Sequence, residues 1–156
     1  MPEKEMLKDG TIAKRVYIQA GAATVYRALT DAQALMRWFC DRASSDPTVG
    51  GELSAYWRTG KSGTRGRAVY RQLIPETLVE LLWIDDGSGP DAEGAHHVLS
   101  YSILVRKGAC EVRVRDRDYP PPDEETYAIL DEGWNSVLID LKEYCEQAER
   151  SSKARR

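Results

Sequence analysis

The sequence changes its hydrophobic period at a run of three prolines, and this change constrains the fold more than any other feature. Before Pro120, Pro121 and Pro122, apolar residues mostly alternate with polar ones, as in strands with one buried face. After them, apolar residues recur three or four positions apart, as in an amphipathic helix. Because proline cannot donate a ladder hydrogen bond, the run ends the sheet. The pattern predicts an antiparallel sheet covered by one long C-terminal helix.

The predicted helix begins after Asp123, a candidate N-cap, and continues to about Arg150. Its apolar stripe consists of Tyr127, Leu130, Trp134, Val137, Leu138, Leu141, Tyr144, Cys145 and Ala148. A helix of this extent is roughly 40 Å long, which is enough to cross a whole sheet. Gly133 lies inside it and indicates either a kink or close packing on a strand.

Alternation predicts about six strands. Their expected ranges are 12–19, 52–58, 67–73, 77–83, 97–105 and 109–116. The range 67–73 fits either face, and we expect Ala68 and Tyr70 to point inward because Arg67 and Arg71 mark the other face. In the first strand, Lys14 is the exception on an otherwise apolar face.

Two short helices are expected between the first two strands. The first, over residues 22–29, places Val25 and Leu29 at helical spacing. Thr30 or Asp31 can then cap a second helix. That helix would place Leu35, Trp38 and Phe39 on one side.

Three stretches rich in glycine, serine, aspartate or proline are expected to be loops: 44–51, 60–66 and 85–94. The second lies in TGKSGTRG, which lacks the GxxxxGK[ST] order of a phosphate-binding loop and is expected to be a hairpin loop. We expect a single domain over residues 11–150, a flexible segment over 1–10 and a flexible basic tail over 151–156.

Composition excludes several classes of function. The chain has 156 residues and a net charge of -3, which disfavours nucleic-acid binding. No apolar run approaches the roughly 20 residues that span a bilayer, and the charged start does not resemble a secretory signal, so the cytoplasm is the expected location. Cys40, Cys110 and Cys145 are far apart and odd in number, which indicates reduced, mostly buried thiols.

The run VYIQAGAATVYRALTDAQALMRWF resembles the opening of the AHSA1 (activator of Hsp90 ATPase) homology family, within the START/Bet v 1-like (SRPBCC) superfamily. The matching residues of this run are Val25, Leu29, Thr30, Asp31, Leu35, Trp38 and Phe39. Further matches are Gly50-Gly51, Gly66, the stretch IPETLVELLW ending at Trp83, and Gly133-Trp134 followed by Leu138 and Leu141. The resemblance covers roughly residues 12–145. It implies an α+β helix-grip fold, in which a curved antiparallel sheet of about six strands surrounds the long C-terminal helix, with two short helices after the first strand.

The chain departs from this family in two places. Family members often carry a histidine-glycine pair after the sixth strand, where this chain has RVRDRDYPPPDEE. The loop over 85–94 is longer and more acidic than the family pattern implies. Both places fall where the mouth of a cavity is expected, so the ligands of relatives do not transfer directly to this chain.

The resemblance implies a cavity between the sheet and the long helix. Its candidate ligand-binding lining is Trp38, Phe39, Trp57, Tyr70, Trp83, Leu99, Tyr101, Ile103, Trp134 and Leu138. Ligand sites are mostly apolar and aromatic, so this set suits a hydrophobic or aromatic small molecule. It suits a filled core equally well, because large aromatic side chains are buried wherever they occur.

No catalytic residue, metal ligand or cofactor is assigned from the sequence. There is no GxSxG elbow, and no CxxC or HxxxH spacing; His96 and His97 are adjacent, so they point to opposite faces of a strand. His97 lies beside an acidic loop, and we expect it to be solvated or ion-paired. An enzyme would require inward polar groups such as Tyr70, Tyr101 and His97 to converge.

Three functions remain open. The first is binding of a hydrophobic, lipid-like or polyketide-like small molecule. The second is a co-chaperone-like interaction with a protein partner, to which the face bearing Arg113, Arg115 and Arg117 could contribute. The third is catalysis of the cyclase or hydrolase kind. We expect neither nucleic-acid binding nor membrane insertion, and a monomer or homodimer.

Overall fold

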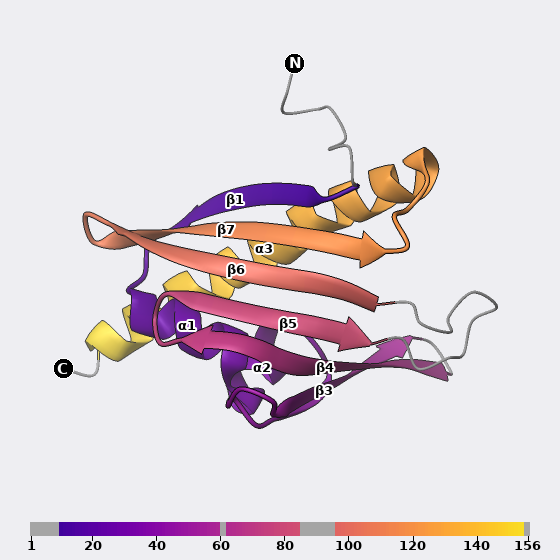
Figure 1. Ribbon diagram of the computed structural model, residues 1–156. Coiled ribbons are helices and arrows are strands. Elements are labelled where there is room, and N and C mark those ends of the chain that lie inside the picture. The colour runs from indigo at the N-terminus through magenta and orange to yellow at the C-terminus, as the bar shows by residue number, and fades with distance from the viewer. Residues whose placement is uncertain (1–9, 60–61, 85–95, 155–156) are drawn as a thin grey trace, which may run out of the picture.

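The structure is a computed structural model that describes residues 10–59, 62–84 and 96–154. Within these residues, the chain forms an antiparallel sheet of seven strands. The strands are β1 Ile12–Ile18, β2 Arg42–Ser45, β3 Glu52–Thr59, β4 Ser62–Ile74, β5 Leu78–Ile84, β6 His96–Arg106 and β7 Ala109–Tyr119. Their order across the sheet is β1-β7-β6-β5-β4-β3-β2, so β1 and β2 form the two edges. The sheet is curved and unclosed, and the long helix α3 lies along one face (Figure 1). The predicted helix-grip fold is confirmed.

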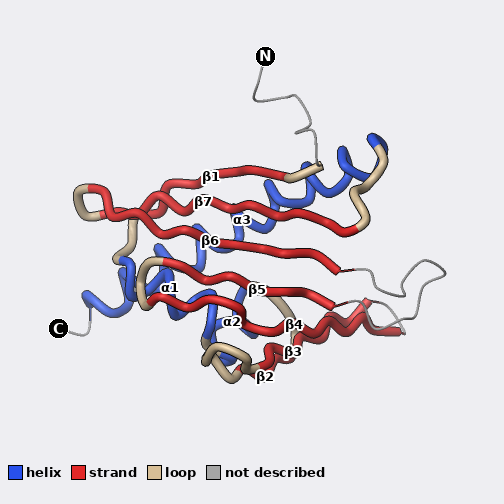
Figure 2. Tube along the Cα trace, viewed as in Figure 1, coloured by secondary structure: helices blue, strands red, loops and turns tan. Residues whose placement is uncertain are grey.

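Three helices accompany the sheet in the described part of the chain: α1 Ala22–Thr30, α2 Ala32–Trp38 and α3 Glu124–Ala154. Figure 2 shows the two short helices on the same side of the sheet as α3, behind β5 and β4. Asp31 ends α1 and caps α2, since its Oδ2 accepts a hydrogen bond from Ala34 N at 3.0 Å. Asp123 caps α3 in the same way, accepting from Thr126 N at 2.7 Å. The helix continues through Ala154, beyond the predicted end near Arg150.

The expected inward faces are confirmed. Ala68 and Tyr70 are fully buried, as the charge of their neighbours predicted. Lys14 points inward as well, because its ammonium group reaches across the apolar layer to α3. There it lies 3.1 Å from Asp131 Oδ1 and donates to Asn135 Oδ1 at 3.0 Å.

Two loop predictions are wrong in part. Residues 44–45 belong to β2, an edge strand too short and too polar for alternation to reveal, in which Ala43 pairs with Ala55. Residues 62–66 belong to β4, where Thr64 pairs with Trp57. Backbone pairing with β3 fixes this segment, although its side chains carry no apolar pattern. The predicted loop over 85–94, the predicted flexible segment over 1–9 and the last two residues lie outside the described part.

Gly133 does not pack closely on a strand. It is exposed, and a Cβ built on it would meet no atom within 4 Å. The alternative of close packing is therefore wrong.

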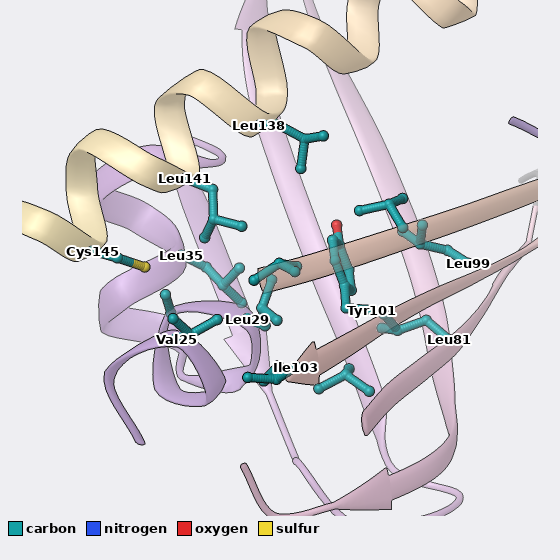
Figure 3. Close-up of a cluster of buried hydrophobic side chains, with 14 of the residues drawn as sticks. Val25, Leu29, Leu35, Leu81, Leu99, Tyr101, Ile103, Leu138, Leu141 and Cys145 are labelled. Carbon is teal, nitrogen blue, oxygen red and sulfur yellow. The ribbon is translucent and has the colours of Figure 1, made fainter. Parts of the chain in front are cut away.

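The core fills the space between the concave face of the sheet and the helices. Figure 3 shows Leu138, Leu141 and Cys145 of α3 facing side chains from α1, α2 and the central strands. Cys110 and Cys145 are buried, Cys40 is half-buried, and all three thiols are free, as predicted. Within the described residues, no helix combines the length and apolar character needed to span a membrane.

Candidate functional site

A cavity of about 540 Å³ lies between the sheet and α3. Its apolar and aromatic lining consists of Phe39, Trp57, Trp83, Ile84, Leu99, Tyr101, Tyr119, Pro120, Leu130, Trp134 and Val137. Polar groups are fewer, and several of them come from the neighbouring strands β6 and β7. This size and this mixture are those of small-molecule sites in general.

The cavity brings together part of the predicted lining. Phe39, Trp57, Trp83, Leu99, Tyr101 and Trp134 line it. The other four predicted residues belong to the core beside it: Trp38, Tyr70, Ile103 and Leu138.

Local hydrogen bonds explain two of these four placements. The indole nitrogen of Trp38 donates to the carbonyl oxygen of Ala28 at 2.8 Å, which ties its ring to α1. The hydroxyl of Tyr70 lies 2.6 Å from Ser45 Oγ and donates to the carbonyl oxygen of Thr30 at 3.4 Å. Tyr70 therefore does not join the inward polar groups that an enzyme would require, because its hydroxyl is engaged with the end of α1 and with β2.

One wall of the cavity is built from three aromatic rings. Trp57 donates its indole N–H to the carbonyl oxygen of Phe39 at 2.6 Å, and the two ring centroids are 5.2 Å apart in an edge-on arrangement. Trp83 lies beside both rings. Gly66 makes this wall possible, because a Cβ there would lie 2.9 Å from the Trp83 ring and 3.1 Å from the Trp57 ring. Only a residue without a side chain leaves room for the two indoles in this position.

A hydrogen-bonded network forms the polar end of the cavity. His97 Nδ1 lies 2.7 Å from Asp116 Oδ1, and Asp116 Oδ2 accepts the indole N–H of Trp134 at 2.9 Å. The imidazole stacks on Trp83 with an interplanar angle of 10°. A second carboxylate, Asp118, places Oδ1 3.8 Å from the same ring nitrogen. The network joins β5, β6, β7 and α3.

The pairing of β6 with β7 positions these groups. His97 lies opposite Asp118, and Leu99 lies opposite Asp116. Sequence reasoning expected His97 to be solvated or ion-paired because of the acidic loop over 85–94, which lies outside the described residues, and it missed Asp116 and Asp118, which the structure places beside the ring. A signal was present, because Asp116 and Asp118 continue the inward parity of the apolar residues of β7. Ending the predicted strand at 116 concealed it.

The pKa values of three groups in or beside this network, His97, Asp118 and Tyr101, are all raised, although the balance of causes differs. Burial of the His97 ring opposes its charged form, but the hydrogen bond and charge of Asp116, with the charge of Asp118, outweigh burial and raise the pKa of His97. Burial and the neighbouring Asp116 raise the pKa of Asp118, which His97 partly offsets. Burial, with a smaller effect of Asp116, raises the pKa of Tyr101, so its phenol stays neutral.

The same three side chains have the spacing of a potential cation site. His97, Asp116 and Asp118 each offer a ligand atom within 4.8 Å of the others. The geometry fits a shared proton better than a metal ion, because Nδ1 and Oδ1 are at hydrogen-bond distance and the other Asp116 oxygen is held by Trp134. We therefore interpret the cluster as an acid–base network.

A second hollow, of about 840 Å³, lies beside β2, β3 and β4. It is more polar than the first, and four arginines line it: Arg42, Arg58, Arg65 and Arg67. Arg67 lies 3.6 Å from Glu52, and Arg65 lies over the ring of Tyr56. This hollow is suited to an acidic surface rather than to an apolar molecule.

Comparison with protein families gives a match over most of the chain. The model described as "Activator of Hsp90 ATPase homolog 1-like protein" matches residues 19–146. A search of curated proteins gave no match.

Solved structures share the fold at low sequence identity. A protein of Chromobacterium violaceum is 19% identical, with a TM-score of 0.76 over 94% of this chain and 99% of its own. The Aha1 dimer from Colwellia psychrerythraea is 23% identical, with a TM-score of 0.68 over 87% of this chain and 96% of its own. DynU16, from the dynemicin biosynthetic locus, is 21% identical with a TM-score of 0.73; the match covers 92% of this chain and 49% of that one.

Proposed function

Because this chain belongs to the family of Activator of Hsp90 ATPase homolog 1-like proteins, we propose that it binds a hydrophobic or aromatic small molecule between its sheet and α3. The observation that carries this proposal is the cavity of about 540 Å³ with its aromatic wall. An apolar space of this size between aromatic rings supports the proposal, since protein interiors otherwise pack as densely as organic crystals. The space is large enough for a ligand with several rings or a short lipid chain.

The walls also indicate how such a ligand would lie. Phe39, Trp57 and Trp83 offer a large aromatic surface on one side. The helix offers Leu130, Trp134 and Val137 on the other. A flat apolar body would lie between them, with a hydrogen-bonding group directed to the polar end.

Native mass spectrometry of the purified protein tests the proposal. We expect a co-purifying compound of definite mass, released on denaturation. A matched pair of variants on α3 locates it. Val137→Trp should fill the cavity, whereas Ile139→Trp places the same side chain at a position that is 53% exposed. The first variant should lose the compound and the second should retain it.

A panel of fatty acids and polycyclic aromatics provides the control for a ligand lost during purification. Absence of any adduct, together with no thermal shift across this panel, would contradict the binding proposal. The same spectra give the oligomeric state, for which the sequence allows a monomer or a homodimer.

A second candidate function is docking of an acidic protein segment, in line with a co-chaperone-like role. The arginine-lined hollow beside β2, β3 and β4 favours it. Fluorescence anisotropy with a labelled oligoglutamate peptide tests this. Binding should weaken with salt and with Arg58→Glu, and should change little with Lys107→Glu, an exposed position outside the hollow. Equal binding by both variants would contradict it.

A further inference from the structure

We propose that His97 and Asp116 form a proton-transfer pair in the cavity wall, with His97 as the base toward a weakly acidic C–H or O–H group of the bound molecule. This inference rests on the proposed binding function and changes its meaning, because the ligand becomes a substrate. Asp116 would be a positioning residue, acting through the imidazole.

The contacts of the ring set its chemistry. Asp116 lies at Nδ1, and a carboxylate at that atom fixes the proton there. The lone pair then belongs to Nε2, the other nitrogen of a ring that lines the cavity. In histidine–aspartate pairs in general, the carboxylate selects the tautomer of the imidazole and stabilises the imidazolium that forms.

The orientation of the pair is fixed from three sides. Asp116 is 6% exposed, and its second oxygen accepts the Trp134 indole N–H. The imidazole lies flat against Trp83. A catalytic base needs such support, because a ring that changed rotamer freely would seldom direct its lone pair at the substrate.

The charges around the ring support the assignment. The carboxylates that act on it are Asp116 and Asp118, both on β7, while Trp83 and Trp134 contribute no charge. Both carboxylates favour the imidazolium that forms when Nε2 takes a proton.

The simplest balanced step is a proton shift within a β,γ-unsaturated carbonyl compound, whose carbon–carbon double bond moves into conjugation with the carbonyl group. Nε2 takes a proton from the carbon next to the carbonyl group, and the electron pair of that C–H bond forms an enolate. The imidazolium then returns the proton to another carbon of the conjugated system. The double bond has moved, the histidine is again neutral, and no oxidant or co-reactant is required.

A probe of defined chemistry tests the pair. 5-Nitrobenzisoxazole is flat and apolar; removal of its ring C–H proton by a base forms a nitrile while the N–O bond breaks, releasing a coloured nitrophenolate. We expect turnover by the wild-type protein, reduced about tenfold or more in His97→Gln and in Asp116→Asn. The wild-type rate should rise with pH as the imidazole loses its proton. Asp140→Asn, which removes an exposed carboxylate of α3, should keep the wild-type rate.

Binding is followed separately by quenching of tryptophan fluorescence. Quenching without a rate difference between wild type and His97→Gln would overturn the proton-transfer pair and leave the binding function intact. Neither quenching nor turnover, together with no adduct and no thermal shift across the ligand panel, would overturn both. Turnover abolished by a chelator would also overturn the proposal, because it would assign the cluster to a metal ion.

One measurement needs no variant. Nitrogen-15 chemical shifts of the neutral His97 ring should show the proton on Nδ1, with His96 as an internal reference. A proton on Nε2 would overturn the proposal, whether or not His97→Gln and Asp116→Asn fold.

Discussion

The indole nitrogen of Trp134 lies 2.9 Å from Oδ2 of Asp116, so the long helix is hydrogen-bonded to the seventh strand within the cavity wall. The two residues are 9% and 6% exposed, and water cannot readily replace either partner. This contact joins the apolar part of the site to its polar end. It also makes the position of Asp116 depend on the docking of α3.

Replacing Trp134 by Phe should lower the free energy of unfolding by about 1–3 kcal/mol, because it removes the donor and leaves a buried carboxylate oxygen without it. Urea denaturation followed by circular dichroism measures this. Asp116→Asn is the informative comparison, since the amide oxygen can still accept from the indole. An unchanged midpoint in Trp134→Phe would show that the hydrogen bond adds nothing to stability.

Stability should depend on pH through His97. The folded state raises the pKa of this imidazole, so it favours the protonated form. The resulting stabilisation is fully present below the pKa of the unfolded chain, about 6.5 for histidine. It is lost as pH rises through the folded pKa.

The difference in unfolding free energy between wild type and His97→Gln should therefore shrink as the pH rises above about 6.5 and through the raised folded-state pKa of His97. Urea titrations at several pH values measure it, and groups common to both proteins cancel in the difference. A difference that grows with pH would mean that burial, rather than the carboxylates, controls this ring.

Gly66→Ala should narrow the cavity and destabilise the fold by about 1–3 kcal/mol, as overpacked cores do. The new methyl group would displace the rings of Trp83 and Trp57, which lie too close to accept it. Thermal unfolding and ligand retention in native mass spectra both report the change. Retention at the wild-type level would show that the two rings can move without closing the cavity.

Gly133→Ala should do the opposite and stabilise the protein by about 1 kcal/mol. The position is exposed within α3 and has free space around it, so alanine gains helix propensity without a steric cost. Chemical denaturation detects a gain of this size. A loss of stability would indicate that the helix depends on glycine there for its curvature.

Tyr70→Phe should cost about 0.5–1.5 kcal/mol without altering ligand binding. The lost hydroxyl bonds Ser45 and Thr30, whereas the ring lies in the core beside the cavity. Tyr70→Phe should therefore lower the free energy of unfolding but leave the affinity in ligand titrations unchanged. Weakened binding would place Tyr70 in the site after all.

Much of the fold was predictable because it depends on periodicity. The inward positions of Ala68 and Tyr70 and the cap at Asp123 followed from alternation, charge and helix-start chemistry. The family resemblance supplied what periodicity could not, namely that sheet and helix enclose a cavity. Strand β2 escaped prediction because an edge strand of four residues is too short and too polar for alternation to reveal.

The site was less predictable than the fold. The sequence predicts Trp57, Trp83 and Trp38 alike as large inward aromatic residues. Side-chain hydrogen bonds determine that Trp57 lines the cavity while Trp38 packs in the core beside it. Asp116 joined the site through strand register, which places it near His97 from a separate part of the chain. Such contacts depend on the register between strands, which cannot be predicted from a single sequence.

Strand β1 pairs with β7, and Lys14 of β1 also forms an ion pair with Asp131 of α3. These contacts have a consequence for the synthesis of the chain. Lys14 of β1 finds a partner on α3 more than a hundred positions later, so contact order is high, and β1 can join the sheet only after β7 has been made. Until then β1 has no neighbouring strand to pair with. A nascent chain of this protein should therefore need protection from aggregation until its last helix has left the ribosome.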